Sequence, residues 1–106
     1  MPKYLIAGSY SAEGAKALMK EGGSSRKAAV EKALTAVGGK LESFYFAFGE
    51  TDVYAIAEMP DNVTAAAVSL ATSALGLVGL KTAVLMTPQE MDAVAKKAAD
   101  YRPPGK

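Results

Sequence analysis

The sequence predicts an α+β domain built on a four-stranded antiparallel sheet, and two observations lead to this prediction. Segments of alternating apolar residues and segments of helical periodicity follow one another in the order β-α-β-β-α-β, with one more helix at the end. Glycines and helix-capping residues mark most of the boundaries between them. A chain of 106 residues has the length of one domain, so we expect a single domain over residues 1–106.

The first third of the chain predicts one strand and an interrupted helix. Residues 3–10 alternate in the manner of a strand, and Ser11 follows where a helix N-cap belongs. Gly22-Gly23 should break this helix, and Ser24-Ser25 should cap a second helical segment. Gly38-Gly39 then ends that segment, because glycine readily adopts the left-handed conformation found after helices.

Residues 41–59 predict a hairpin whose two strands are joined by the acidic turn Gly49-Glu50-Thr51-Asp52. Simple alternation places Leu41 and Tyr45 on one face of the first strand, and its three phenylalanines on the other: Phe44, Phe46 and Phe48. Neither strand shows the polar face of an antiparallel sheet with one side in water. We therefore expect both faces of the sheet to be covered.

The second half of the chain predicts a helix, a strand and a final helix. Asp61 is a good N-cap for a helix that Gly76 ends, and residues 77–86 form the fourth strand. Thr87-Pro88-Gln89-Glu90 is a strong helix start, with a threonine cap, a proline at the first helical position and a glutamate at the third. Residues 102–106 should form an extended tail.

This element order is that of the ferredoxin-like fold, in which both main helices cover one face of the sheet. The other face is apolar here and too large for the chain itself to cover. We therefore expect a homodimer or a higher homo-oligomer, in which two helix-free faces pack together as a dimeric α/β barrel.

Composition excludes several classes of site and partner. The chain has 12 Lys and Arg against 11 Asp and Glu without a basic stripe, so we expect no nucleic-acid partner. Cysteine and histidine are both absent, which excludes Ser-His-Asp and Cys-His catalysis and the usual zinc ligand sets. We predict no metal and no cofactor. The apolar segments are too short for a signal peptide or a membrane span, so a cytoplasmic location without a membrane partner is the default.

Two polar segments are candidate sites. Glu50 and Asp52 lie two residues apart and could act as acid and base or hold a hard cation. A structural role of Asp52 in the turn, with Glu50 solvated, is the competing interpretation. Ser24 and Arg26 lie at a predicted helix start, where backbone amides and a cation favour an anion. A capped helix with solvated cations is the alternative there.

The aromatic residues form the third candidate. Aromatic side chains with a few tyrosine hydroxyls suit a planar organic ligand, and we expect Tyr10 and Tyr45 to present their hydroxyls to a pocket. Packing in the core and at the dimer interface is the competing role.

The chain resembles the GYD-domain family of small bacterial proteins. The resemblance spans nearly the whole chain and rests on these stretches: Tyr4–Tyr10 with Glu13-Gly14, Gly22–Arg26, Gly38–Leu41, Phe44–Gly49, Asp52-Val53 and Pro60–Asn62. Thr51 departs from the family pattern, which has a tyrosine before the aspartate. The resemblance implies the dimeric α/β-barrel fold and carries no activity with it.

These observations predict a homo-oligomeric domain that binds a small organic or anionic ligand in or near the barrel, without catalysis. Its ligand-binding candidates are Tyr10, Ser24, Arg26 and Tyr45. The alternative is a cofactor-free enzyme of the dimeric-barrel type, an oxygenase or an isomerase, whose catalytic candidates are Asp52, Glu50 and Tyr45.

Overall fold

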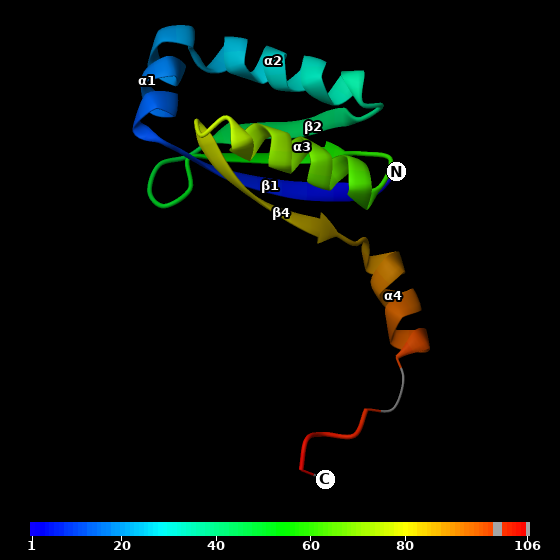
Figure 1. The fold of residues 1–106 in the computed structure, drawn as a ribbon. Helices are drawn as coiled ribbons and strands as arrows, with labels where there is room; N and C mark the ends of the chain where they lie inside the picture. The colour runs from blue at the N-terminus through cyan, green and yellow to red at the C-terminus, as the bar shows by residue number, and fades with distance from the viewer. Residues whose placement is uncertain (99–100, 106) are drawn as a thin grey trace.

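A computed structural model describes residues 1–98 and 101–105 of the chain (Figure 1). Lys106, the last residue of the predicted tail, lies outside the described residues. The elements follow one another as β1 (Lys3–Tyr10), α1 (Ala12–Glu21), α2 (Gly23–Ala36), β2 (Lys40–Phe46), β3 (Val53–Glu58), α3 (Asn62–Ala74), β4 (Val78–Leu85) and α4 (Pro88–Lys97).

The four strands form one sheet in the order β2-β3-β1-β4, and every neighbouring pair is antiparallel. Helices α1, α2 and α3 cover the sheet, and α4 extends away from it (Figure 1). The predicted α+β class, the four-stranded antiparallel sheet and the added C-terminal helix are confirmed.

Three predicted helix starts are confirmed and one is wrong. Ser11, Asp61 and Thr87 each accept a hydrogen bond from a backbone amide of the first helical turn, and Thr87 forms a complete capping box with Glu90. The expected Ser24-Ser25 cap does not form, because α2 begins earlier, at Gly23, without a side-chain cap. Gly22 has a φ of 89°, which turns the chain from one helix directly into the next.

The predicted side-chain alternation along β2 is wrong at both ends. A β-bulge between Leu41 and Ser43 inserts an extra residue, and Leu41 consequently shares the helix-covered face with Phe44. Their partners on β3, Ala57 and Ala55, are both buried. The strand then ends at Phe46, so Phe48 lies in the loop before β3 with its side chain 98% exposed.

The core lies between the sheet and the helices. It is formed by Tyr4, Leu34, Ala57, Met59 and Ala65. The Tyr4 ring is buried, and its hydroxyl donates a 2.6 Å hydrogen bond to Asn62 Oδ1 at the start of α3. This bond ties the first strand to the third helix.

The helix-free face of the sheet carries both apolar and charged residues. Strand pairing places these apolar side chains on it: Leu5, Ala7, Tyr45, Tyr54, Ile56, Ala83 and Leu85. The same pairing places Lys3, Ser43, Glu58 and Lys81 on this face. Tyr45 is 70% exposed and Tyr54 is 42% exposed. The sheet therefore has no wholly polar face, as predicted, but its helix-free face is not wholly apolar either.

Candidate functional site: a cavity between the helices and the sheet

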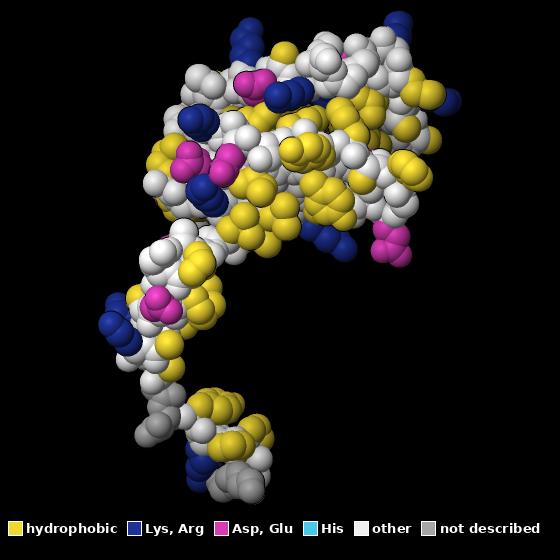
Figure 2. Space-filling view, turned by 180° about the vertical axis from the view of Figure 1, so that it is seen from behind, with side chains coloured by type: hydrophobic (Ala, Val, Ile, Leu, Met, Phe, Trp, Pro, Cys, Tyr) yellow, Lys and Arg dark blue, Asp and Glu magenta, His cyan; other side chains and the backbone are white. Residues whose placement is uncertain are grey.

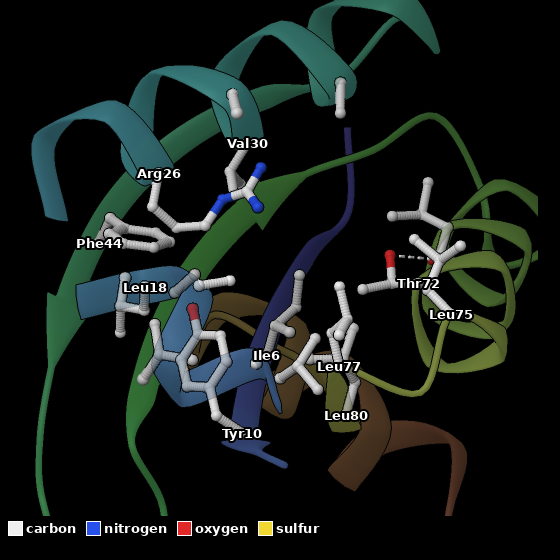
Figure 3. Close-up of a pocket in the computed structure, with 18 of the residues that line it drawn as sticks. Ile6, Tyr10, Leu18, Arg26, Val30, Phe44, Thr72, Leu75, Leu77 and Leu80 are labelled. Atoms are coloured by element: carbon white, nitrogen blue, oxygen red, sulfur yellow. Dashed lines mark hydrogen bonds between the residues drawn. The ribbon is translucent and has the colours of Figure 1, made fainter. Parts of the chain in front are cut away.

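A cavity of about 340 Å³ lies between the helices and the sheet (Figure 3). Its walls come from α1, α2 and α3 on one side and from all four strands on the other. Ligand pockets in proteins commonly measure about 300–1,000 Å³, so this space suits a small organic molecule. It lies within a single chain, on the helix-covered face.

Small side chains leave room for the cavity. Ala17, Ala29 and Ala33 line it from α1 and α2, and Ala55 lines it from β3. Ala55 is buried and Ala29 is half-buried, whereas Ala17 and Ala33 are exposed, so the cavity is not closed beside them. An alanine methyl group fills far less volume than the leucine or phenylalanine that a close-packed interior uses at such positions. The alanine-rich composition of the chain is thus the physical origin of the space.

Most of the lining is apolar, and the polar groups are few. Figure 3 shows Ile6, Leu77 and Leu80 around one side of the cavity and Phe44 and Leu18 around the other. The residues that bring polar side chains are Tyr10, Glu21, Arg26 and Thr72. The Thr72 hydroxyl is already used, since it donates a 2.7 Å hydrogen bond to the carbonyl of Val68 in its own helix. The remaining three come from the end of β1 and the α1–α2 junction.

Arg26 is the main polar group of the cavity. It stands in the first turn of α2, and its guanidinium points into the space (Figure 3). Nε is buried and has no hydrogen-bond partner among the described residues. A terminal nitrogen lies 3.7 Å from a carboxylate oxygen of Glu21, which is too long for a strong charge-assisted hydrogen bond. The guanidinium therefore retains donors for an acceptor in the cavity.

Tyr10 brings a hydroxyl to the same part of the cavity. Burial raises the pKa of Tyr10 above its ordinary value, and the nearby positive charge of Arg26 opposes this in part. A phenol is protonated at neutral pH already at its ordinary pKa near 10, so Tyr10 can donate a hydrogen bond, and the raised pKa keeps it protonated at still higher pH. Tyr10 and Arg26 were predicted as ligand-binding residues by separate arguments, and the fold brings them together in one cavity.

The other two predicted ligand-binding residues lie elsewhere. Tyr45 belongs to the helix-free face and does not line the cavity. Ser24 is exposed at the start of α2 and also lies outside the lining. The start of α2 is itself occupied by an acidic group, because the Glu21 carboxylate lies beside Arg26 and accepts a hydrogen bond of 3.4 Å from Ser25. A negative charge there disfavours an anion on the outer side of the helix end.

The acidic loop does not meet the tyrosines in a common pocket. Asp52 Oδ2 accepts a 2.9 Å hydrogen bond from the backbone amide of Tyr10, and its own backbone amide donates to the carbonyl of Gly8. Glu50 is exposed, and its backbone carbonyl accepts a 2.6 Å bond from the Ser9 hydroxyl. Both residues fasten the loop to the end of β1, and neither lines the cavity.

Sequence reasoning missed the location of the cavity and the part played by Glu21. The predicted pocket lay inside a barrel made by two copies, whereas this space is lined by one chain. Alanines that recur in two successive helices were the signal that could have found it. Among the described residues, no three acidic side chains gather where they could hold a metal ion, and no helix has the length and apolarity to cross a membrane.

The GYD-domain family model matches residues 4–95. The chain belongs to this family. Both the cavity and the acidic loop lie within the matched part of this GYD domain. Searches of curated proteins and of solved structures return no significant match.

Proposed function

We propose that this GYD domain binds a small organic acid in the cavity between the helices and the sheet. The apolar body of the ligand lies against the leucines and Phe44, and its carboxylate accepts hydrogen bonds from Arg26 and Tyr10. The observation that supports this most directly is the buried Arg26 Nε without a partner, at the wall of an otherwise apolar space. Burying a polar group without a partner is costly, so a ligand that supplies the acceptor gains binding energy.

A carboxylate fits this arrangement better than a neutral ligand. A guanidinium presents donors in a planar fork that matches the two oxygens of a carboxylate. The protonated phenol of Tyr10 adds a donor and no competing charge. Glu21 is the acidic group closest to Arg26, and because it is held only at 3.7 Å, an incoming carboxylate can replace it as the partner of the guanidinium.

The test is binding of benzoate and phenylacetate, with benzamide as the neutral counterpart of benzoate, measured by calorimetry and by the rise in melting temperature. Arg26→Met keeps an apolar stem and removes the charge. A hydrogen bond to a charged group contributes about 1.5–3 kcal/mol, so we expect Arg26→Met to weaken carboxylate binding by about 10- to 150-fold. Tyr10→Phe should weaken it less.

Lys27→Met is the matched control, because Lys27 is the neighbouring cation on α2, is exposed and does not line the cavity. It should bind benzoate as the wild type does. Equal binding of benzoate and benzamide by the wild type, or equal losses in the two methionine variants, would contradict the proposed contact. Mass spectrometry of the purified protein under native conditions can also identify a retained acid.

We further propose that the domain has the ferredoxin-like topology and assembles as a homodimer through the helix-free sheet face, as a dimeric α/β barrel. The strand order β2-β3-β1-β4 supports the topology, and the exposed apolar residues of the face support the assembly. Exposed tyrosines such as Tyr45 and Tyr54 are residues of the kind enriched at interfaces.

Tyr45→Asp tests this assembly, because it introduces a charge into the proposed interface. The matched control is Phe48→Asp, which introduces the same charge at an aromatic residue in the exposed loop. Light scattering should give a dimer mass for the wild type and for Phe48→Asp, and a lower average mass for Tyr45→Asp. A monomeric wild type at micromolar concentration with native circular dichroism would refute the dimer.

A further inference from the structure

Helix α3 has two apolar faces, although the sheet covers only one. Ala65, Val68 and Thr72 point to the sheet and the cavity. On the opposite side of the helix, a second set of apolar residues follows the spacing i, i+3, i+4 and i+7: Val63, Ala66, Ala67 and Leu70. Val63 is 79% exposed and Leu70 is 74% exposed. We call these four residues the outer stripe of α3.

None of the 13 residues of α3 is charged. A helix on the surface of a globular protein normally carries charged residues on its outer side, and a helix that is apolar all round is normally buried. Beside the outer stripe runs a groove of about 490 Å³ between α3 and β4. Leu70, Leu80 and Val84 line it together with uncharged polar residues, and the hydroxyls of Ser69 and Thr82 are already joined there by a 2.8 Å hydrogen bond. Strand β4 is also an edge of the sheet, where natural proteins commonly place a covering element.

Helix α4 has the opposite character. Its apolar residues Met91, Val94 and Ala95 form one stripe, while Asp92 and Lys96 lie on other sides of the helix. Met91 is 49% exposed and Val94 is 45% exposed, so the apolar stripe is not covered within the chain. Figure 2 shows hydrophobic side chains along one side of the projecting helix, with charged side chains elsewhere on it.

The chain directs α4 away from its own groove. Only Met86 and Thr87 separate β4 from α4, and Thr87 is fixed by the capping box while Pro88 fixes the first helical φ. As a result α4 projects beyond the sheet, away from α3 (Figure 1). An amphipathic helix of this length is marginal in water by itself, since most helical stability in proteins comes from packing of the apolar face.

We propose that α4 is an exchanged arm, and that its apolar stripe docks on the outer stripe of α3 and the adjoining groove of a second copy of the chain. Both surfaces expose apolar side chains at the spacing that packed helices use. In the proposed contact, one chain supplies α4 and the second chain supplies α3 and the groove. The charged residues of α4 remain on the side of the docked helix that faces solvent. Helix α3 itself has no charged residue that could repel them or pair with them.

A two-fold exchange doubles the contact that one arm can make. A specific interface buries about 1,200–2,000 Å² in total, which is a large demand on one short helix. In a two-fold pair each chain gives one arm and receives one, so the contact occurs twice. This inference is argued from α3, β4 and α4 alone and does not rest on the proposed ligand or on the sheet-face dimer.

Disulfide trapping tests the exchange directly, because the chain has no cysteine of its own. Val94→Cys and Leu70→Cys chains, made with different mass tags and co-expressed, are oxidised and separated by mass. A disulfide forms only where two Cα atoms approach within about 7 Å. A disulfide between the two tagged chains therefore shows that α4 of one chain lies against α3 of the other. We expect this mixed dimer as the main product. Replacing Val94→Cys by Lys96→Cys, on another side of α4, should abolish it.

Other products of the same experiment would overturn the proposal. A Leu70–Leu70 disulfide as the main product indicates that α3 packs against α3 of the second copy. A disulfide within one chain of the double variant Leu70→Cys/Val94→Cys, without mixed dimers, indicates that α4 folds back on its own groove. Equal yields from Val94→Cys and Lys96→Cys indicate random collision.

A second measurement uses charge instead of thiols. Met91→Asp/Val94→Asp adds two carboxylates to the apolar stripe, and Gln89→Asp/Ala93→Asp adds two on other sides of the same helix. Sedimentation across a range of concentrations should show weaker self-association of the first variant than of the second variant and the wild type. Unchanged association in the first variant, with native circular dichroism, would overturn the exchange.

Discussion

Removing the Asp52 carboxylate should destabilise the fold without affecting ligand binding. Asp52 Oδ2 accepts the 2.9 Å hydrogen bond from the Tyr10 amide at the end of β1, in a partly buried position. A hydrogen bond to a charged group contributes about 1.5–3 kcal/mol, and partial exposure places this one near the lower end. We therefore expect Asp52→Ala to lower the free energy of unfolding by about 1–2 kcal/mol. Asp52→Asn keeps an acceptor oxygen and should cost about half as much.

Urea denaturation measures this directly, and thermal melting should follow it. A loss of 1 kcal/mol lowers the melting temperature of a domain of this size by about 4–8 °C. Glu50→Ala is the matched control, since Glu50 is exposed in the same loop and its ordered contact is made by a backbone carbonyl. It should change stability by less than about 0.5 kcal/mol, the usual range for surface substitutions.

Two results would refute the structural role of Asp52. The first is an Asp52→Ala variant as stable as Glu50→Ala. The second is a folded Asp52→Ala variant that has lost benzoate binding, because Asp52 does not line the cavity and should act only on stability. The second result would restore Asp52 as a candidate catalytic or binding residue.

The remaining predictions concern close packing and helix capping. Gly14→Ala should destabilise the domain by at least about 1–3 kcal/mol, the usual cost of overpacking. The reason is that the added Cβ would lie 1.9 Å from the backbone carbonyl oxygen of Leu77. Lys16→Ala in the same helix is the control and should leave the free energy of unfolding in urea nearly unchanged. Asp61 should contribute to acid unfolding, because the backbone and side chain of Thr64 donate hydrogen bonds that hold the pKa of Asp61 below its ordinary value. Because the pKa of Asp61 is lower in the folded than in the unfolded chain, its carboxylate stabilises the fold above the unfolded-state pKa near 4. This stabilisation is lost as the pH falls through the folded-state pKa. Asp61→Asn keeps a capping side chain that does not titrate, so the free energy of unfolding of this variant should approach or exceed that of the wild type in acid. A difference in unfolding free energy that does not change with pH would contradict this.

Local sequence determined the element order and most of the boundaries. Ser11, Asp61 and Thr87 each cap a helix within three residues of the amide they accept from, so the signal and the structure it specifies lie side by side in the chain. Gly22 ends one helix and begins the next for the same local reason. The absence of a wholly polar sheet face could likewise be read from alternation, because strand geometry sends successive side chains to opposite sides.

Local sequence patterns did not predict which residues of neighbouring strands pair. The bulge in β2 depends on which residues of β3 lie opposite Leu41 and Ser43, and it moved Leu41 to the helix-covered face. The carboxylate of Asp52 likewise bonds to an amide 42 residues away, not to an amide of its own turn. A pattern within one strand or one turn contains no information about such partners.

The sequence by itself determined the fold class and three of the helix starts, and it supplied the candidate residues for a ligand site. Only the tertiary structure decided which of these candidates meet: it brought Tyr10 and Arg26 into one cavity and left Tyr45 and Ser24 outside it. The physical reason is that a cavity is a deficit of volume among several packed elements. The alanines of α1 and α2 create that deficit only when both helices lie over the same part of the sheet, and this arrangement is set by long-range packing.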